Sequence, residues 1–466
     1  QVTGPASDRH CRQVVVLVDN RFDAERVPLF HPMYDFYGYG GLYRSVSWRE
    51  VGDWWIERVQ VRPTTAQGGA VELQVRFGGA VPASVPLQLA FDHGALQELG
   101  PQTVTDGSCT LSATVPEPRR WSPPDPQLHR LRLQTPAGGI VERFGLRQVT
   151  VDGQRILLDG QPIRLLGYNR HEVHPQSGPA LPRQQLVEDL QILQDLGCNC
   201  IRGSHYPQDQ TFLDLCDEYG FLVWEETLGW GYDETQWRQP RFAPANHEQA
   251  RLMVRNSFNH PSVILWGFFN EGGSHLTETG PLYHELATVL RAEDPTRLLT
   301  YASNRLWEQS GDAHLDCIDV VSLNMYPGWY ADPAQGSRPL ADVVPCLRGA
   351  WQTLAELGAG NKPLIISEIG AGAIYGCRDR HAAHWSEEYQ RDFLALTCAE
   401  IIGQERYAGL TIWQYCDGRT YDDGRALGRP RAFNNKGTLD EYRRPKLAYD
   451  AVRQRFRAAA VGQRPR

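Results

Sequence analysis

The fold prediction rests first on the stretch SVILWGFFNE, residues 262–271. Its apolar residues follow one another without the spacing of an amphipathic helix, which is typical of a buried strand. The run then ends in Asn270 and Glu271. A carboxylate at the end of a buried run carries a desolvation cost that a structural role seldom justifies. The stretch therefore predicts a buried strand that ends in a candidate functional group.

Strand-like runs of this kind recur along the C-terminal two thirds of the chain and alternate with amphipathic helical patterns. One helix is expected in LPRQQLVEDLQILQDLG (181–197), where Leu186, Leu190 and Leu193 share a face. The eight strand candidates are IRLLGYN (163–169), CNCIRGS (198–204), FLVWEE (221–226), SVILWGFFNE (262–271), LLTYAS (298–303), VVSLNMY (320–326), PLIISEIG (363–370) and AGLTIWQYCD (408–417). They predict a catalytic (β/α)8 TIM barrel over residues 149–466, whose weakest helix follows the fifth strand.

The N-terminal third has a different pattern. Residues 58–148 alternate apolar and polar side chains in short runs broken by Gly and Pro, such as VELQVRF (71–77) and LHRLRLQT (128–135). This pattern predicts an antiparallel β-sandwich of immunoglobulin type. Residues 1–57 form a third region, in which RQVVVLVDN (12–20) predicts a strand. The aromatic stretch YDFYGYGGLYR (34–44) predicts a loop and strand that pack on a neighbour.

Composition excludes some classes of partner. The chain has 466 residues, 41% hydrophobic and 22% charged, with a net charge of -8 and no long run of like charge, so no nucleic-acid partner is expected. No apolar stretch approaches the roughly 18 residues of a membrane span, so no membrane partner is expected. The ten cysteines show no CxxC pair or zinc spacing and predict reduced, mostly buried thiols. The sequence begins at Gln1 without a visible secretory signal. We expect a cytoplasmic location.

Two glutamates stand at strand ends on opposite sides of the predicted barrel mouth. Glu271 follows the fourth strand, and Glu368 follows the apolar residues of the seventh. Because the carboxyl ends of barrel strands form the usual active-site face, both should border one pocket. Paired carboxylates are typical of glycoside hydrolases. One protonates the leaving oxygen, and the other attacks the anomeric carbon or activates water. Their sequence positions leave retention and inversion open.

Other strand ends carry polar and aromatic residues of the kind that hold a sugar. They are NRHE (169–172), RGSHY (202–206), NMYPGWY (324–330), Trp413 and Asp417. A tryptophan at a pocket mouth can stack on a sugar, although core packing is its commoner role. His171, His174 and His205 fit no familiar helical zinc motif. We therefore expect neither a metal nor another cofactor.

The stretch FNNKG, residues 433–437, places two amides and an ammonium together after the last strand candidate. Asn and Gly are common turn residues, and a neighbouring lysine is usually solvated, so the stretch by itself predicts an exposed turn.

Several blocks in order resemble one family of enzymes. They are GYNRHEVHP (167–175), IRGSHYP (201–207), CDEYGFLVWEE (216–226), ILWGFFNEG (264–272), NMYPGWY (324–330), IISEIG (365–370) and RRPK (443–446). The sequence resembles glycoside hydrolase family two over nearly its whole length, and within that family the β-glucuronidases. The asparagine-glutamate pair and SEIG are the most specific of these signals.

The resemblance implies a retaining mechanism on an architecture of two β domains and a barrel, with residues 1–57 as a truncated β jelly-roll. It implies that Glu271 is the general acid and base and that Glu368 is the nucleophile of a covalent glycosyl-enzyme. Asn270 would hold the sugar 2-hydroxyl, and Tyr326 would bond the nucleophile and keep it ionised.

The resemblance also implies a substrate site for uronic acids. Asn434 and Lys436 of FNNKG match an asparagine and a lysine that bind the C6 carboxylate, and a charge-assisted bond of this kind favours a uronide over a neutral sugar. The further contacts that it implies come from His171, Trp413, Tyr330, Asp35 of the first domain, and Arg431 as a helper. The expected substrate is a small-molecule or oligosaccharide glucuronide, and the expected assembly is a homo-oligomer.

Departures from the family pattern leave alternatives open. The first domain is shorter than in the family, and no long insertion follows the second strand, so an open mouth that admits larger aglycones is expected. The alternatives are a β-galacturonidase or β-galactosidase of the same family, because a carboxylate clamp does not fix the C4 configuration. A further alternative is that the protein is a catalytically impaired homologue that binds sugars.

Overall fold

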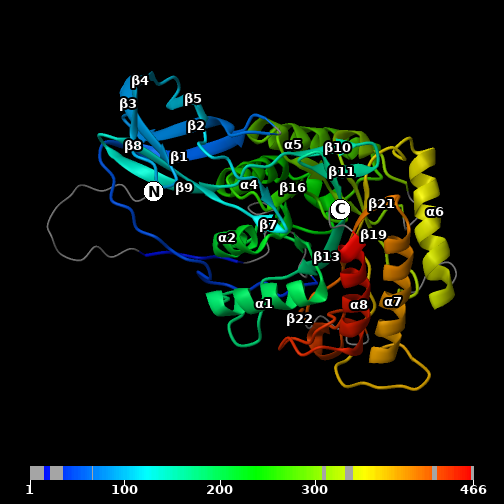
Figure 1. The fold of residues 1–466 in the computed structure, drawn as a ribbon. Coiled ribbons are helices and arrows are strands. Elements are labelled where there is room, and N and C mark those ends of the chain that lie inside the picture. Colours follow the sequence, from blue (N-terminus) through cyan, green and yellow to red (C-terminus); the bar gives the residue numbers. More distant parts are fainter. Residues whose placement is uncertain are drawn as a thin grey trace.

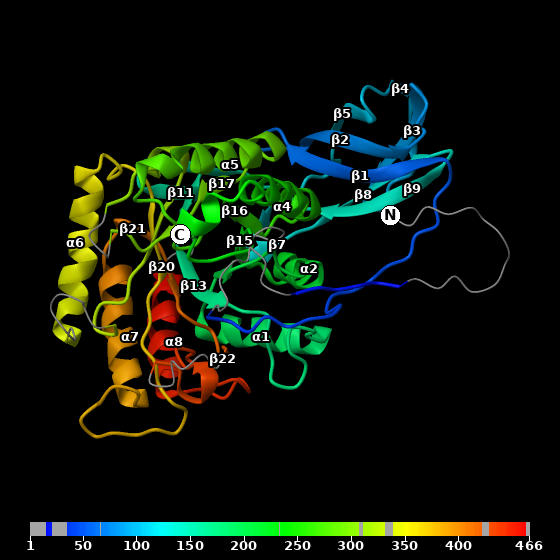
Figure 2. The same ribbon diagram turned by 180° about the vertical axis from the view of Figure 1, so that it is seen from behind.

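The computed structural model describes residues 15–20, 35–65, 67–232, 234–306, 311–330, 339–421 and 428–462. Two bodies make up most of this part of the chain. An antiparallel β-sandwich lies at one end of the molecule, and an α/β barrel surrounded by helices lies at the other (Figures 1 and 2). The sandwich and barrel architecture predicted from the sequence is confirmed.

The sandwich consists of two antiparallel sheets whose buried faces pack together. The first has the order β1–β2–β5 and the second β4–β3–β8–β9. The strands are β1 (Trp54–Pro63), β2 (Ala70–Gly79), β3 (Ser84–Phe91), β4 (Gln97–Thr103), β5 (Ser108–Thr114), β8 (His129–Thr135) and β9 (Gly138–Phe144). Along β2 the alternate residues Val71, Leu73, Val75 and Phe77 are buried. The alternation seen in the sequence therefore marks the inner face.

The barrel strands form one parallel ring. They are β13 (Leu165–Arg170), β14 (Cys200–Gly203), β15 (Leu222–Glu226), β16 (Val263–Gly267), β17 (Leu298–Thr300), β18 (Ala302–Ser303), β19 (Val321–Asn324), β20 (Leu364–Glu368) and β21 (Tyr407–Ile412). The order is β17–β16–β15–β14–β13–β21–β20–β19–β18. The predicted fifth strand is interrupted at Tyr301: β17 pairs with β16, and β18 pairs with β19. These two short pieces close the ring, and all eight strand predictions are confirmed.

Helices cover the outside of the barrel. They are α1 (Arg183–Leu196), α2 (Gln210–Tyr219), α3 (Glu234–Trp237), α4 (Phe242–Ser257), α5 (Gly280–Glu293), α6 (Val343–Glu356), α7 (Glu387–Gly403) and α8 (Leu447–Gly462). Between β18 and β19 the described residues hold only the 3-10 turn η2 (Leu315–Cys317), which agrees with the expected weak fifth helix. In α1, Leu186, Leu190 and Leu193 are buried as the spacing predicts.

Short elements complete the described chain. They are β6 (Trp121–Ser122), β7 (Asp125–Pro126), β10 (Val149–Asp152), β11 (Arg155–Leu158), β12 (Gln161–Ile163), β22 (Gly418–Arg419), β23 (Phe433–Asn434) and the turns η1 (Thr277–Thr279), η3 (Leu340–Asp342) and η4 (Pro430–Ala432). No helix in these ranges combines the length and apolar character of a membrane span. The cysteines in the same ranges form no disulfide.

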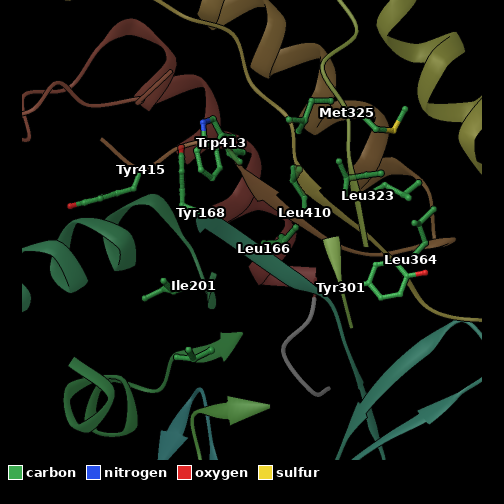
Figure 3. Packing of buried hydrophobic residues seen from close by; sticks show 14 of the residues in the cluster. Leu166, Tyr168, Ile201, Tyr301, Leu323, Met325, Leu364, Leu410, Trp413 and Tyr415 are labelled. Carbon is green, nitrogen blue, oxygen red and sulfur yellow. The ribbon is translucent and has the colours of Figure 1, made fainter. Parts of the chain in front are cut away.

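The main core lies between the barrel sheet and its helices. Figure 3 shows part of it around β13 and β21, where Leu166, Tyr168 and Leu410 pack together. Strand residues of the other parity face the barrel interior, which is polar near the mouth. There the Asn169 side chain donates to the backbone oxygens of Ser367, Thr411 and Ile412. The carboxyl ends of the strands are thereby tied together from inside.

The N-terminal region differs from its prediction. Residues 15–20 form no strand, so the strand predicted over residues 12–20 is wrong there, and its other residues lie outside the described part. Val15 and Leu17 are exposed, and no described strand pairs with them, so apolar character alone did not make a sheet. Residues 35–53 also contain no strand, and β1 begins before the expected domain boundary.

The stretch 35–44 packs on the barrel mouth as an extended loop. The Tyr37 amide donates to the Arg419 carbonyl over 2.9 Å, and the Gly38 amide donates to the Tyr421 hydroxyl over 2.9 Å. Further along, Arg44 forms a 2.7 Å ion pair with Glu172, at the end of the first barrel strand. The predicted loop that packs on a neighbour is present, and its neighbour is the barrel; the predicted strand is not formed in the described residues 35–44.

A buried ion triad fixes the first strand end to the C-terminal part of the chain. Asp189 of α1 pairs with Arg170 at 2.9 Å and with Arg443 at 2.9 Å, and all three side chains are almost fully buried. Burial alone would raise the pKa of Asp189, but the two guanidinium groups outweigh it and lower the pKa. Since Arg170 precedes His171, the triad also positions the barrel mouth.

We expect Asp189→Asn to lower the free energy of unfolding by about 3–5 kcal/mol, because it leaves two buried guanidinium groups without their carboxylate. In wild type, the ionised Asp189 carboxylate contributes this stabilisation fully above the unfolded pKa of about 3.9, and the contribution is lost as pH falls through the lowered folded pKa. The variant lacks it at every pH. Urea unfolding followed by tryptophan fluorescence measures the change. Asp195→Asn on the same helix is the matched control, since its carboxylate is 41% exposed and should contribute at most about 1 kcal/mol. Equal losses in both variants would contradict the role of the triad.

Candidate active site

The two glutamates predicted to carry chemistry both lie at the carboxyl ends of barrel strands. Glu368 is the last residue of β20, and Glu271 lies four residues beyond the end of β16. The backbone between β16 and Glu271 is unusual, because Phe269 and Glu271 both have a φ of 51°. Non-glycine residues seldom adopt this left-handed conformation, and those that do gather at functional sites. The Asn270 amide between them remains buried.

A continuous chain of hydrogen bonds joins the two glutamates. The Asn324 amide donates to Glu271 Oε1 over 2.9 Å and to Asn270 Oδ1 over 3.0 Å. Arg202 donates to the same Asn270 oxygen over 2.8 Å and to Glu368 Oε1 over 2.7 Å. Strands β14, β16, β19 and β20 thus contribute to one site. The structure brings Glu271, Glu368 and Asn270 together as the sequence analysis expected.

Glu368 is buried between donors. The Tyr326 hydroxyl donates to Glu368 Oε2 over 2.7 Å, and Arg202 donates to Oε1. Burial raises the pKa of Glu368 above its ordinary value, Arg202 opposes this, and the neighbouring Glu271 adds to it. Burial and the same carboxylate raise the pKa of Tyr326, which remains a donor. These contacts orient the Glu368 carboxyl and favour its charged form against the effect of burial.

Arg202 is a central residue of the site, to which the sequence analysis gave no role beyond its place in the strand-end stretch RGSHY. Its guanidinium is fully buried, pairs with Glu226 at 3.0 Å as well as with Glu368, and stacks over Trp224. Burial would raise the pKa of Glu226, but Arg202 and His205 lower it. The sequence did carry a signal, because an arginine interrupts the apolar strand CNCIRGS. Strand-end position alone did not show that its charge faces two carboxylates.

Glu271 has a second donor that the sequence analysis also missed. The Trp230 indole Nε1 donates to Glu271 Oε2 over 2.8 Å. Trp230 lies in the loop after β15, where no spacing or motif had marked it. Both carboxylate oxygens of Glu271 therefore accept hydrogen bonds, one from Asn324 and one from Trp230.

A second polar cluster lies beside the glutamates and is called the clamp below; its members are Asp35, Tyr330, Arg429, Asn434 and Lys436. Lys436 Nζ donates to the Tyr330 hydroxyl over 2.7 Å, and Arg429 donates to the same oxygen over 3.2 Å. Asn434 Nδ2 donates to Asp35 Oδ2 over 2.7 Å, and Arg429 pairs with both oxygens of Asp35.

The clamp carries a buried positive charge. Lys436 is only 2% exposed. Burial and the nearby Arg429 lower its pKa. Lys436 Nζ also lies over the rings of Tyr330 and Tyr326, at 4.7 and 5.5 Å from their centroids. With Arg429 and Lys436 opposed by Asp35, the formal charge of the clamp is one positive unit, so one added carboxylate would neutralise it.

Arg431 lies apart from the clamp. It contacts Glu441 at 3.2 Å and Asn435 at 3.3 Å, and its side chain is about half exposed. Arg429, two residues earlier, contacts Asp35 and Tyr330 instead. The φ of 64° at Arg431 marks a local reversal of the chain, which a count of sequence offsets does not show. The arginine of this loop that joins the predicted residues is therefore Arg429.

Two aromatic side chains expected to contact a sugar lie together at the mouth. Trp413 stacks on His205 with centroids 5.2 Å apart and meets His171 edge-on at 5.4 Å. Burial lowers the pKa of His171, so its ring is neutral near pH 7. The buried Nε2 of His171 and Nδ2 of Asn270 have no hydrogen-bond partner among the described residues. Such groups can bind sugar hydroxyls without giving up existing bonds.

A cavity of about 400 Å³ adjoins the site on the side of the N-terminal loop. His171 and Asp35 border both, and five further aromatic side chains, among them Phe36, Tyr39 and Tyr206, line the remaining wall together with polar and aliphatic residues. The 35–44 loop therefore forms part of the barrel mouth.

Among the described residues, Asp214, Asp217 and His260 form a group with the ligand types for a metal. Asp217 already accepts from His260 over 2.6 Å and from the Ser262 amide over 3.0 Å, while Asp214 pairs with Arg143. These bonds account for the group as a structural network between α2 and β16.

The structure joins a β-sandwich to a TIM barrel and links two glutamates across the barrel mouth. Two carboxylates placed in this way are typical of glycoside hydrolases. The chain belongs to glycosyl hydrolase family 2. The family description "Glycosyl hydrolases family 2, TIM barrel domain" matches residues 149–461, which is most of the barrel.

Several proteins similar to this chain are named as β-glucuronidases or as a β-galacturonidase. A β-glucuronidase of Sus scrofa is 30% identical over 443 residues, which cover 91% of this chain and 65% of the relative. The chain thus spans about two thirds of the length of the curated relatives that it matches. A solved GH2 β-galacturonidase from Eisenbergiella tayi bound to galacturonate has a TM-score of 0.87 and 34% identity, covering 95% of this chain and 78% of that one. A Faecalibacterium prausnitzii β-glucuronidase has a TM-score of 0.74 and 28% identity over 87% and 66% of the two chains.

The raised pKa of Glu368 leads to a prediction about stability. A carboxyl whose folded pKa is raised stabilises the fold in its protonated form, fully below its ordinary pKa of 4.5, and this stabilisation is lost as pH rises through the folded value. We expect Glu368→Gln, which cannot ionise, to melt at a higher temperature than wild type at pH 7.5. The difference should shrink towards pH 4. Differential scanning calorimetry measures it.

Glu188→Gln on α1, where the side chain is exposed, is the control and should change the melting temperature little at either pH. A lower melting temperature of Glu368→Gln at pH 7.5 would contradict the prediction and show that the ion pair with Arg202 outweighs burial.

Proposed function

We propose that this protein is a retaining, exo-acting β-glucuronidase that hydrolyses β-D-glucuronides through a covalent glycosyl-enzyme. The observation that carries the proposal is the hydrogen-bonded chain from Glu271 through Asn324, Asn270 and Arg202 to Glu368. It is supported by the family, by the names of the relatives, and by a cationic clamp beside the two glutamates. The family 2 resemblance supports retention.

The two glutamates have different surroundings, which supports different roles. Glu368 is held by Arg202 and the Tyr326 hydroxyl, donors that favour a charged, oriented carboxylate, so it acts as the nucleophile on the anomeric carbon. Glu271 gives its proton to the glycosidic oxygen as the bond to the anomeric carbon breaks. It then takes a proton from the water that releases the sugar from Glu368.

The remaining side chains of the mouth position the sugar. The unpaired Nδ2 of Asn270 donates to the 2-hydroxyl, close to the reacting carbon, where a bond that strengthens in the transition state lowers the barrier. His171 offers Nε2 to a further hydroxyl, and Trp413 supplies an apolar face. Both are held by aromatic contacts with their neighbours.

The clamp supports a uronic acid as the sugar. Lys436 and Arg429 converge on the Tyr330 hydroxyl, and Asp35 offsets only one of their two charges, so a second anion would stabilise the cluster. The C6 carboxylate supplies that anion, with Asn434 as an additional donor. A neutral CH2OH group cannot replace these charge-assisted bonds, so a glucoside or galactoside is rejected.

A β-galacturonidase is the second candidate. The solved structure with 34% identity is a β-galacturonidase bound to galacturonate, which has the same carboxylate and the opposite configuration at C4. The clamp recognises what both uronic acids share. The galactosidase alternative is less favoured, because it leaves one positive charge of the clamp unbalanced, since Asp35 offsets only one of the two.

We expect Lys436→Met to lower kcat/KM for 4-nitrophenyl β-D-glucuronide or galacturonide roughly 10- to 150-fold, which corresponds to loss of a bond to a charged group of about 1.5–3 kcal/mol. Activity on 4-nitrophenyl β-D-galactoside should remain low and unchanged. Initial rates on the three glycosides measure this, and their ratio in wild type decides between the two uronides. Equal wild-type turnover of galactoside and glucuronide would refute a uronide-specific site.

The neighbouring arginines provide a matched pair for the same assay. Arg429→Met removes a charge that contacts Tyr330 and Asp35, whereas Arg431→Met removes one that faces Glu441. We expect a loss of at least about tenfold in uronide kcat/KM for the first and less than about twofold for the second. The reverse order would place the carboxylate elsewhere.

A covalent intermediate on Glu368 is the third expectation for this activity. A 2-fluoro glucuronide or galacturonide with a good leaving group should label the protein once, and peptide mass spectrometry should find the label on Glu368. Glu368→Gln should take up no label. Label on another residue would refute the assignment of the nucleophile. Binding of uronides with no turnover between about pH 4 and 8 would favour the sugar-binding homologue.

A cytoplasmic location, homo-oligomeric assembly and a preference for large aglycones stay predictions.

A further inference from the structure

The loop after β15 contains the stretch LGWG, residues 228–231, which none of the roles above explains. Its backbone is anchored on both sides of the site. The Gly229 amide donates to the His205 carbonyl over 3.0 Å, and the Gly231 amide donates to the Asn270 carbonyl over 2.9 Å. Trp230 and Asn270 form an isolated parallel bridge. The loop therefore extends the sheet pairing to the residue that precedes Glu271.

The two glycines are required by this path. Gly229 has a φ of 132° and Gly231 a φ of 67°, values that residues with a Cβ rarely adopt. A Cβ on Gly229 would lie 1.4 Å from the Tyr232 hydroxyl, which donates to the Leu228 carbonyl over 2.6 Å. The Leu228 amide donates to Gln249 Oε1 over 2.6 Å. These contacts fix the direction of the Trp230 side chain.

We propose that Trp230 is a positioning residue for the acid and base carboxyl of Glu271, an inference that rests on the proposed function. With Asn324 on Oε1 and the indole on Oε2, rotation of the carboxyl breaks a bond at either oxygen. The two donors thereby fix the plane of the carboxyl group. The indole is a neutral donor that cannot titrate, so it serves the acid and the base form without exchanging a proton.

The indole acts most strongly in the first step. As Glu271 gives its proton to the leaving oxygen, negative charge grows on the carboxylate, and a fixed N–H donor stabilises it more in the transition state than before. Substrates whose leaving group departs as a stable anion need little proton transfer. Loss of the indole should therefore lower kcat/KM mainly for substrates with poor leaving groups. A general structural defect would lower it for all substrates alike.

The experiment compares Trp230→Phe with Trp237→Phe. Trp237, at the end of α3, is a partly buried indole seven residues further on that packs against the barrel core. The readout is kcat/KM for the phenyl and the 2,4-dinitrophenyl glycoside of whichever sugar wild type hydrolyses. We expect Trp230→Phe to lose roughly 10- to 100-fold on the phenyl glycoside and less than about threefold on the dinitrophenyl glycoside. Trp237→Phe should lose little on either.

Equal losses on both leaving groups, or no loss on either, would overturn the proposal. Melting temperatures of both variants exclude a folding defect as the cause.

A second measurement tests the contact without relying on turnover. The indole N–H resonance of Trp230 is assigned in a ¹⁵N-labelled sample by its absence from Trp230→Phe. It should shift in Glu271→Gln, which replaces the carboxyl acceptor by an amide, and stay in place in Glu188→Gln. An unshifted resonance in Glu271→Gln overturns the inference whatever the substrate. Failure of wild type to hydrolyse any uronide, together with a shifted resonance, would count against the proposed function and leave the positioning contact supported.

Discussion

The guanidinium of Arg202 is the interaction on which the barrel mouth depends. It is fully buried and touches side chains from four other strands or strand ends: Asn169, Glu226, Asn270 and Glu368. A buried charge of this kind is tolerated only if each of its donors finds an acceptor. Two carboxylates and two amides meet that condition here. The positions of the proposed nucleophile and of the amide beside the proposed acid are therefore set by one side chain.

The partners of Arg202 hold further side chains of the mouth in turn. Asn169 is held by backbone oxygens of β20 and β21 at the same time as it accepts from Arg202. Glu226 accepts from His205, and His205 stacks on Trp413. The proposed acid, the proposed nucleophile and the proposed sugar-binding surface thus share hydrogen-bonding and stacking partners. Displacing any one of them disturbs groups from the first, second, third and eighth strands.

Much of the fold was readable from the sequence, because each barrel strand is a compact apolar run that ends in polar residues. The runs containing Leu166, Leu265 and Ile366 all became strands of the ring. Where prediction failed, pairing was decided by distant parts of the chain. Residues 15–20 are as apolar as a strand, yet no described strand lies beside them, and local propensity does not supply a partner.

The candidate site also contains residues that the sequence predicted and residues that it did not. Glu271, Glu368 and Asn270 could be predicted because they interrupt apolar runs at strand ends, and FNNKG because a resemblance gave a role to Asn434 and Lys436. Arg429 could not be separated from Arg431 on sequence offsets, since a left-handed residue in the loop reverses the direction of successive side chains. Trp230 gave no signal at all, because its role depends on a loop that reaches Asn270 from another strand.

The distribution of charge across the mouth bears on which substrates fit. The end near the glutamates holds Glu226 and Glu368 against Arg202, a formal excess of one negative charge that favours an oxocarbenium-like transition state. The clamp holds Lys436 and Arg429 against Asp35, an excess of positive charge. A uronide has its anomeric carbon and its C6 carboxylate on opposite sides of the ring oxygen, so it can place positive character at one end and negative charge at the other. A neutral sugar matches only the first end. A free uronic acid that lacks an aglycone still offers its carboxylate to the clamp, and it would therefore compete with the substrate.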